Sequence, residues 1–184
     1  MGSALFKWVT PNQLTLVRIV TIPPILVLIY RGDPLSNWVA MGIYFVACVT
    51  DFLDGRLARF RGEVSSIGKL LDPIADKMLV SACLVMLVSL DAASVVATLL
   101  ILLREFAVSG MRQVAAVEGV VVSASYIAKY KTTLQMLAVG FLIVRHDSFS
   151  FPSVQIGEVL LWVSVVVTLW TGLDYFRDYF RKIP

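Results

Sequence analysis

Four aspartates lie in two strongly apolar stretches of the sequence, where charged side chains are rare. Asp51 and Asp54 are three positions apart, and Asp72 and Asp76 are four positions apart. Because helical residues at these spacings share a face, each pair is expected to project from one side of its helix. A carboxylate near the middle of a membrane costs about 2.5–3.5 kcal/mol on insertion scales. Four of them would also repel one another, so the pattern predicts that a positive group lies between them.

The depth of the carboxylates is similar in the two stretches. Asp51 precedes Arg59 by eight residues and Asp76 follows Gly68 by eight, which places both about 12 Å inside the expected helix ends. The other two aspartates lie roughly 6–8 Å inside by the same arithmetic. An antiparallel helix pair would bring the four into two layers. All-oxygen ligation suits Mg²⁺ or Mn²⁺, and two such cations would hold a pyrophosphate between them.

Three small residues accompany the aspartates at one-turn spacing. Gly55 follows Asp51 by four residues, Ala58 follows Asp54 by four, and Gly68 precedes the next aspartate by four. Each leaves open space beside a predicted metal ligand, where a nucleotide could lie against the backbone. The alternative is close helix packing through small residues.

The composition predicts a membrane protein independently of any motif. Of the 184 residues, 58% are hydrophobic, against about 45–50% in soluble domains, and the mean hydropathy is +0.82. We expect an all-α membrane protein with one polytopic catalytic domain over residues 1–184. A short interfacial helix around Phe6, Lys7 and Trp8 is expected to precede six membrane spans. The expected spans are 14–30, 38–58, 69–90, 92–111, 126–144 and 156–173, with Pro23 and Pro24 kinking the first.

Charge and cysteine content restrict the function further. The net charge of +3 gives no support to nucleic-acid binding, and Cys48 and Cys83 lie in apolar runs that predict packing roles. Lys and Arg concentrate at one set of span ends, which predicts cytoplasmic termini and a cytoplasmic active site in the cell membrane. That set is Lys7, Arg59, Arg61, Arg112, Lys129, Lys131, Arg177, Arg181 and Lys182, against Arg31 and Arg145 in the opposite loops.

The acidic pattern resembles the signature of the CDP-alcohol phosphotransferase family at eight fixed positions: Asp51-x2-Asp54-Gly55-x2-Ala58-Arg59-x8-Gly68-x3-Asp72-x3-Asp76. Most similar is the bacterial subgroup that makes phosphatidylglycerophosphate, over essentially the whole chain. One departure is Ala128, where that subgroup commonly has Gly. The further matching segments are Pro11-Asn12-x-Leu14-Thr15-x2-Arg18, Leu71-Asp72-Pro73-x-Ala75-Asp76-Lys77, Arg104-Glu105 with Arg112, and Lys129-x-Lys131-Thr132-Thr133-x-Gln135-Met136.

The resemblance implies a six-helix, usually homodimeric enzyme with a polar cavity open to the cytoplasm. It implies that Asp51, Asp54, Asp72 and Asp76 ligate two divalent cations, Mg²⁺ or Mn²⁺, and that Asp76 is also the general base. The donor would be CDP-diacylglycerol, with its acyl chains among the membrane lipids. The residues implied around that donor are Gly55, Ala58 and Gly68 at the cytidine, Arg59 at the phosphates, and Asn12, Thr15 and Arg18 at the border.

Four cations are candidates for binding an acceptor that carries a phosphate, and the resemblance implies that this acceptor is glycerol 3-phosphate. Arg104 precedes Arg112 by eight residues, about 80° around a helix, so both are expected to face one cavity. Lys129 and Lys131 open the next span from the same membrane side. Arg suits bidentate phosphate recognition, and Lys adds point charge. The alternatives are membrane anchoring for the lysines and an ion pair with Glu105 for Arg104, which is disfavoured because helical neighbours point about 100° apart.

The sequence is also compatible with two other functions. Intramembrane carboxylates also mark ion pathways, so a cation transporter is the alternative of a different class. The aspartates lie near one side, however, and the fourth to sixth spans offer few acidic residues at other depths. Within the enzyme class, the acceptor could instead be phosphatidylglycerol or inositol phosphate, as in cardiolipin or phosphatidylinositol-phosphate synthesis.

Overall fold

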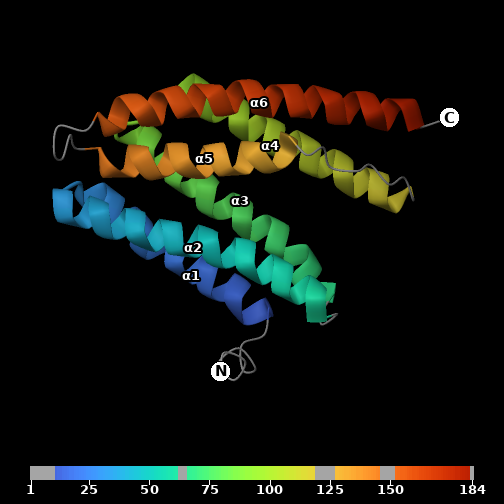
Figure 1. Cartoon of the computed structure of the whole chain (residues 1–184), viewed down its shortest axis with the longest axis horizontal. Helices are drawn as coiled ribbons and strands as arrows, with labels where there is room; N and C mark the ends of the chain where they lie inside the picture. Colours follow the sequence, from blue (N-terminus) through green and yellow to red (C-terminus); the bar gives the residue numbers. More distant parts are fainter. Residues whose placement is uncertain (1–10, 62–65, 119–126, 146–151, 183–184) are drawn as a thin grey trace. The chain divides into compact units, whose positions relative to one another are not determined.

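The computed structural model describes residues 11–61, 66–118, 127–145 and 152–182, and its regular secondary structure in these ranges is α-helical (Figure 1). Within these ranges the side chains of residues 11–15, 51–61, 66–73, 76, 127–129 and 182 are not described. The helices are α1 (Pro11–Arg31), α2 (Pro34–Arg61), α3 (Ser66–Ser89), α4 (Val95–Val117), α5 (Ile127–Val144) and α6 (Ser153–Lys182). Each of the six predicted spans overlaps one of these helices, and the expected all-α class is confirmed for the described residues.

The helices form two compact units, Met1–Met86 and Leu87–Pro184. The first unit holds α1, α2 and most of α3, and the second holds α4, α5 and α6. All four aspartates of the predicted metal site belong to the first unit. The arginines and lysines of the predicted acceptor site belong to the second.

In the first unit, α1 packs against α2. Ile25 and Ile29 of α1 are fully buried, as are Ala40 and Tyr44 of α2. Four-residue spacing in both helices aligns these side chains along one face of each. Pro23 and Pro24 lie inside α1, which remains helical across both. The packed pair fixes the first half of α2, upstream of its two aspartates.

The start of α2 is specified locally by Asp33. Its Oδ2 accepts a hydrogen bond from the Ser36 N–H at 2.9 Å, and its Oδ1 accepts one from the Ser36 hydroxyl at 2.7 Å. Pro34 occupies the first helical position, where no intrahelical donor is needed. The hydrogen bond from the Ser36 hydroxyl has the largest effect on the pKa of Asp33, followed by the bond from the Ser36 N–H. Both hold this pKa below the ordinary value of 3.8.

Three helices end on a residue in the left-handed region. Gly32 after α1 has φ 72°, Asp91 after α3 has φ 53°, and Arg145 after α5 has φ 50°. At α3 the Ala92 N–H donates to the Leu87 carbonyl at 2.8 Å, which is the long bond of a Schellman motif. The odd-numbered helices thus share one type of termination, in the loops predicted to lie opposite the cytoplasm.

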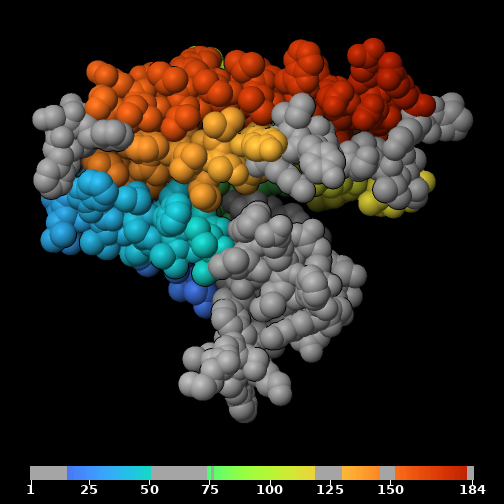
Figure 2. Space-filling view, viewed as in Figure 1, coloured from blue at the N-terminus to red at the C-terminus, as the bar shows by residue number. Residues whose placement is uncertain are grey.

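In the second unit, α6 packs against both α5 and α4. Figure 2 shows the side chains of α6 against those of α5 along much of the face in view. The two helices approach closely at Gly157, where an added Cβ would lie 2.8 Å from Cγ and 3.1 Å from the backbone nitrogen of Leu142. Glycine is therefore required there by space.

The two sides of α6 have opposite chemistry. Its buried side carries hydroxyl residues at spacings of four, three, four and four: Ser164, Thr168, Thr171, Tyr175 and Tyr179. Its exposed side carries large apolar residues, among them Val159, Trp162, Val166, Trp170 and Leu173. Polar groups inside and apolar groups outside suit a helix surrounded by lipid, because hydrocarbon cannot hydrogen-bond to the hydroxyls.

Among the described residues, the stretch Ser153–Arg181 is long and apolar enough to cross a membrane. Its 29 residues would extend about 44 Å as a helix, more than a hydrocarbon core of roughly 30 Å. In α4, the charges of Arg104, Glu105 and Arg112 interrupt an otherwise apolar sequence. The predicted interfacial helix at residues 6–8 lies outside the described part of the chain.

Candidate active site

The predicted metal ligands, which we call the acidic site, lie on two consecutive helices. Asp51 and Asp54 are on α2, and Asp72 and Asp76 are on α3. Only residues 62–65 separate the end of α2 from the start of α3, and in Figure 1 α3 turns back from the point where α2 ends. The backbone therefore places both pairs close in sequence to the same helical connection.

The helix boundaries give the depths of the four aspartates in the two predicted layers. Asp51 lies ten residues before Arg61, the last residue of α2, and Asp76 lies ten residues after Ser66, the first residue of α3. Both are thus about 15 Å from the connection along their helices. By the same measure Asp54 lies seven residues and Asp72 six residues from it. This agreement in depth fits carboxylates that share hard divalent cations.

The side chains of the acidic site lie outside the described set. No group of three or more His, Cys, Asp or Glu side chains that could hold a metal occurs among the side chains that are described. The donor set itself, four carboxylates without nitrogen or sulfur ligands, suits Mg²⁺ or Mn²⁺.

The predicted donor-binding residues lie on the same two helices and on α1. Gly55, Ala58 and Arg59 follow the first aspartates on α2, and Gly68 is in the first turn of α3. Asn12, Thr15 and Arg18 are on α1. Of these seven, only the side chain of Arg18 is described, and it is 5% exposed. A buried arginine in an apolar unit fits a structural or ligand-binding role rather than a solvated one.

Arg104, Glu105 and Lys131 form a compact group in the second unit, which we call the basic cluster. Nη1 of Arg104 donates to Oε1 of Glu105 at 3.0 Å, and Nζ of Lys131 donates to the same oxygen. The side chains of Arg104 and Lys131 are only 10% and 8% exposed, and that of Glu105 is 17% exposed. Two nearly buried cations from α4 and α5 therefore share one carboxylate oxygen.

The expectation that Arg104 would not pair with its neighbour Glu105 is wrong. Adjacent helical residues do diverge by about 100° at the backbone, but both side chains are long enough to curve back toward each other. Lys131 approaches from another helix and stabilises the bent arrangement. The three groups carry a net charge of +1, so the cluster remains attractive to an anion.

Arg104 is also held by α6. Its Nη2 donates to Oγ1 of Thr171 at 2.9 Å. An added Cβ on the next residue, Gly172, would lie 3.0 Å from Cγ and 3.1 Å from Nε of Arg104. The arginine side chain thus lies directly on the backbone of α6, between a hydroxyl and a position that has no side chain.

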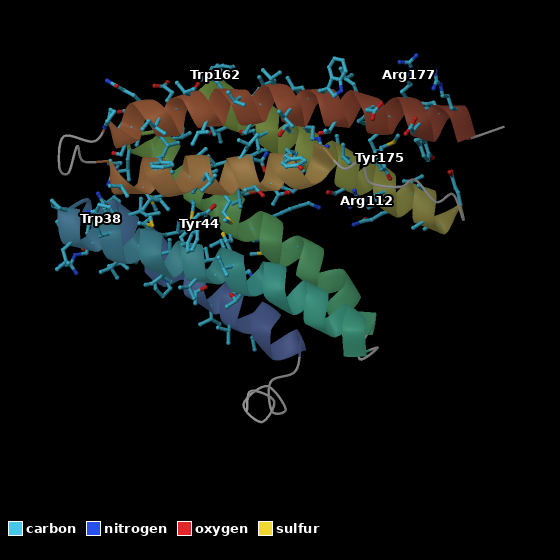
Figure 3. All side chains as sticks on the ribbon, viewed as in Figure 1. Trp38, Tyr44, Arg112, Trp162, Tyr175 and Arg177 are labelled. Atoms are coloured by element: carbon cyan, nitrogen blue, oxygen red, sulfur yellow. The ribbon has the colours of Figure 1, made fainter. Side chains whose placement is uncertain are left out.

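Arg112 faces the same helix farther along. Its guanidinium carbon lies 5.6 Å from the ring centroid of Tyr175 (Figure 3), within the range of a cation–π contact. Tyr175 is four residues after Thr171, one helical turn, so the two arginines contact α6 about 6 Å apart along its axis. The prediction that Arg104 and Arg112 project to the same side of α4 is consistent with these contacts. Arg112 is exposed, unlike Arg104.

Lys129 occupies the first turn of α5, two residues before Lys131. Its side chain is outside the described set, so its predicted part in phosphate binding stays a prediction. The backbone places it at the end of α5 from which Lys131 reaches Glu105.

Comparison with known proteins identifies the family. A sequence profile described as CDP-alcohol phosphatidyltransferase matches residues 8–170. The chain belongs to this family. The match includes both the acidic site and the basic cluster, and it confirms the family that the spacing of the aspartates predicted.

Individual members of the CDP-alcohol phosphatidyltransferase family resemble the chain over nearly its whole length. A protein of Rickettsia typhi is 42% identical over 91% of this chain and 94% of its own. A protein of Bacillus subtilis is 38% identical over 90% and 92%, and one of Haemophilus influenzae is 32% identical over 93% of each. All three are named CDP-diacylglycerol–glycerol-3-phosphate 3-phosphatidyltransferase. Family and helix composition together mark this chain as a membrane-associated protein.

Thr171, Gly172 and Tyr175 were not predicted from the sequence to have a role, although all three contact the predicted acceptor cations. A signal was present. Hydroxyl residues recur on one face of α6 every three or four positions from 164 to 179. In a membrane-associated family such a stripe indicates a polar surface facing other helices.

Proposed function

We propose that the chain transfers the phosphatidyl group of CDP-diacylglycerol to the sn-1 hydroxyl of glycerol 3-phosphate, giving phosphatidylglycerophosphate and CMP. Relatives named for this activity are 38–42% identical over 90–91% of the chain, which supports it. The observation that carries the choice of acceptor is the basic cluster, because Glu105 compensates only one of the two nearly buried cations, Arg104 and Lys131. The remaining positive charge in a membrane helix calls for an anionic ligand.

The acidic site is proposed to bind the donor. Asp51, Asp54, Asp72 and Asp76 would ligate two divalent cations, Mg²⁺ or Mn²⁺, which supply charge neutralisation and alignment of the pyrophosphate. Gly55, Ala58 and Gly68 leave space for the cytidine along the backbone of α2 and α3. Arg59 would bind the phosphates, with Asn12, Thr15 and Arg18 of α1 at the border.

The transfer step is a substitution at the phosphorus that carries the diacylglycerol oxygen. The oxygen of the sn-1 hydroxyl forms a new bond to this phosphorus while the bond to the CMP oxygen breaks. The electron pair of that bond leaves with CMP, and the hydroxyl proton passes to a carboxylate oxygen of Asp76. Positioning and charge stabilisation account for most of the rate in such reactions, with one proton transfer added.

The second unit is proposed to bind the acceptor phosphate. Arg104 and Lys131 are nearly buried and fixed by Glu105, and Arg112 supplies a more exposed guanidinium one turn along α6. With Arg112 the described groups carry a net charge of +2, which matches a phosphate dianion. Lys129 would add a further cation from the start of α5. An acceptor without a phosphate would leave this charge unbalanced.

The membrane arrangement is part of the proposal. Six helices would cross the membrane of the cell, with both termini and the active site at the cytoplasmic side. The chain would act as one polytopic domain and assemble as a homodimer. The inverted chemistry of α6, with hydroxyls buried and apolar side chains exposed, supports a lipid environment for this helix.

A CMP-release assay on the full-length protein tests the proposal. Purified enzyme would receive CDP-diacylglycerol with Mg²⁺ or Mn²⁺, together with glycerol 3-phosphate, glycerol, phosphatidylglycerol or inositol phosphate. We expect turnover with glycerol 3-phosphate, none with glycerol, and complete loss on chelation that either metal reverses. Faster turnover with inositol phosphate or phosphatidylglycerol would overturn the acceptor assignment. Metal flux across vesicles without any CMP release would favour the transporter instead.

A further inference from the structure

We infer that Thr171 and Gly172 of α6 are positioning residues that fix Arg104 for binding the acceptor's phosphate. This inference rests on the proposed function and extends it to a helix to which that function assigns no residue. Arg104 is on α4, and a direct hydrogen bond joins it to Thr171, although the two lie 67 positions apart in the sequence. Neither α6 residue is proposed to touch a substrate.

The hydroxyl of Thr171 is oriented by its own helix. Its Oγ1 lies 2.8 Å from the carbonyl oxygen of Val167 and 3.1 Å from that of Thr168. The single hydroxyl proton is therefore directed back along α6. The oxygen lone pairs remain for an external donor, and Nη2 of Arg104 occupies that position at 2.9 Å. The hydroxyl oxygen of Thr171 is thus oriented to accept a hydrogen bond. A guanidinium, which can only donate, requires such an acceptor.

Gly172 determines how closely Arg104 can approach α6. A Cβ at this position would meet the side chain of Arg104 at 3.0 Å from Cγ and 3.1 Å from Nε. Both distances are shorter than ordinary van der Waals contact, so any larger residue displaces the arginine. Glycine lets the flat guanidinium and its stem lie against the backbone while Nη2 reaches Thr171.

Together with Glu105, these residues hold both ends of the guanidinium. Nη1 is bound by Glu105 and Nη2 by Thr171. Within the described part of the chain, this leaves one further N–H on each of these nitrogens, because arginine has five in total. A planar fork whose orientation is already fixed loses little entropy when it binds a phosphate. Among the described residues, Arg112 contacts a ring face and is exposed, so its orientation is less restricted there.

Loss of this arrangement should change the KM of one substrate and not that of the other. A loss of orientation at Arg104 weakens binding of the acceptor phosphate, and the donor site is chemically separate. The KM for glycerol 3-phosphate should therefore rise, while the KM for CDP-diacylglycerol stays constant. A purely structural role for Thr171 would lower stability and affect both substrates alike.

The main test substitutes Thr171 by Val and by Ser in the full-length enzyme. Thr171→Val keeps the shape but removes the acceptor, and we expect the KM for glycerol 3-phosphate to rise about tenfold, as for loss of a hydrogen bond to a charged group. Thr171→Ser retains the hydroxyl and should restore the wild-type value. The matched control is Thr168→Val, which removes a buried hydroxyl that bonds Gln135 instead of Arg104 and should leave this KM unchanged.

A second pair of variants tests the same inference without altering any hydrogen-bonding group. Gly172→Ala should raise the KM for glycerol 3-phosphate severalfold, whereas Gly110→Ala on α4, where an added Cβ meets nothing within 4 Å, should not. Binding of glycerol 3-phosphate measured by calorimetry should weaken in parallel. Equal acceptor KM values for Thr171→Val and Thr168→Val, or equal changes in both substrates, would overturn the inference. Absence of turnover in the wild type would instead overturn the proposed function.

Discussion

The acidic site and the basic cluster are specified by the sequence in different ways. The four aspartates lie on two consecutive helices, and their depths follow from the helix boundaries alone. The basic cluster joins α4 to α5 across 26 residues and α4 to α6 across 67 residues. Local spacing therefore suffices to define the first, whereas the second exists only when three helices have packed. The two sites should accordingly respond differently to substitution.

The largest effect is expected in the acidic site, from Asp76→Asn. If Asp76 takes the proton of the acceptor hydroxyl, its loss should reduce CMP release by about 10²–10⁴-fold. The protein should remain folded, because the amide keeps the shape of the side chain. The control is Asp91→Asn, an exposed position with φ 53° that asparagine tolerates. Substantial residual turnover in Asp76→Asn would remove its role as the base.

A large but selective effect is expected beside the basic cluster, from Arg112→Ala. Loss of one charge-assisted contact should raise the KM for glycerol 3-phosphate roughly tenfold to a hundredfold, with little change for CDP-diacylglycerol. Arg31→Ala is a suitable control, since the Arg31 side chain is 67% exposed. If both substrates lost affinity equally, Arg112 would have no special relation to the acceptor.

A smaller effect is expected from Gly157→Ala, because the added methyl group should push α5 and α6 apart. The added Cβ would lie 2.8 Å from Cγ of Leu142 and 3.1 Å from its backbone nitrogen. Overpacking of this kind costs about 1–3 kcal/mol, and it should lower the melting temperature and raise the acceptor KM modestly. Gly140→Ala is the control, because nothing lies within 4 Å of a Cβ there. An unchanged acceptor KM in a destabilised variant would show that the basic cluster tolerates displacement of α6.

The smallest effect is expected from Asp33→Ala, which removes the cap of α2, the helix that carries Asp51 and Asp54. The pKa of Asp33 is lowered in the folded protein by hydrogen bonds from Ser36. Its stabilising contribution is therefore present above the ordinary pKa of 3.8 and is lost as the pH falls through the lower folded value. Thermal unfolding at a series of pH values should show a decrease of a few degrees at pH 7 that disappears in acid. A decrease independent of pH would exclude the carboxylate as its cause.

Within the described residues, the number and order of the helices could be predicted from the sequence, because apolar runs separated by charged or glycine-containing breaks define them. The ends of the helices could be predicted less accurately. The last span was predicted at 156–173, but α6 extends over Ser153–Lys182. Its final turns carry Asp174, Arg177 and Asp178, so a criterion based on apolar residues stops too early. Helical periodicity continues there although hydrophobicity does not.

The candidate site could likewise be predicted only in part from the sequence. The spacing of the aspartates was sufficient to identify the family, since it depends only on residues close in sequence. The pairing of Arg104 with Glu105 was not predicted, because helix geometry describes the backbone and not the reach of long side chains. Thr171 was overlooked because a threonine in an apolar helix is ordinarily a neutral packing residue. Its partner becomes apparent only when α4 and α6 are placed side by side.

The shared carboxylate of Glu105 has a consequence for how the protein is made. During synthesis α4 emerges before α5 and α6, and at that stage Lys131 and Thr171 have not yet been made. Within the basic cluster Arg104 and Glu105 can then pair only with each other, and insertion of a charged helix centre alone costs about 2.5–3.5 kcal/mol per residue. If α4, α5 and α6 cross the membrane as proposed, α4 should stay beside the insertion machinery until α5 and α6 arrive, so that the last three helices enter the bilayer as a group. Truncation before residue 171 should leave α4 accessible to water-soluble labels.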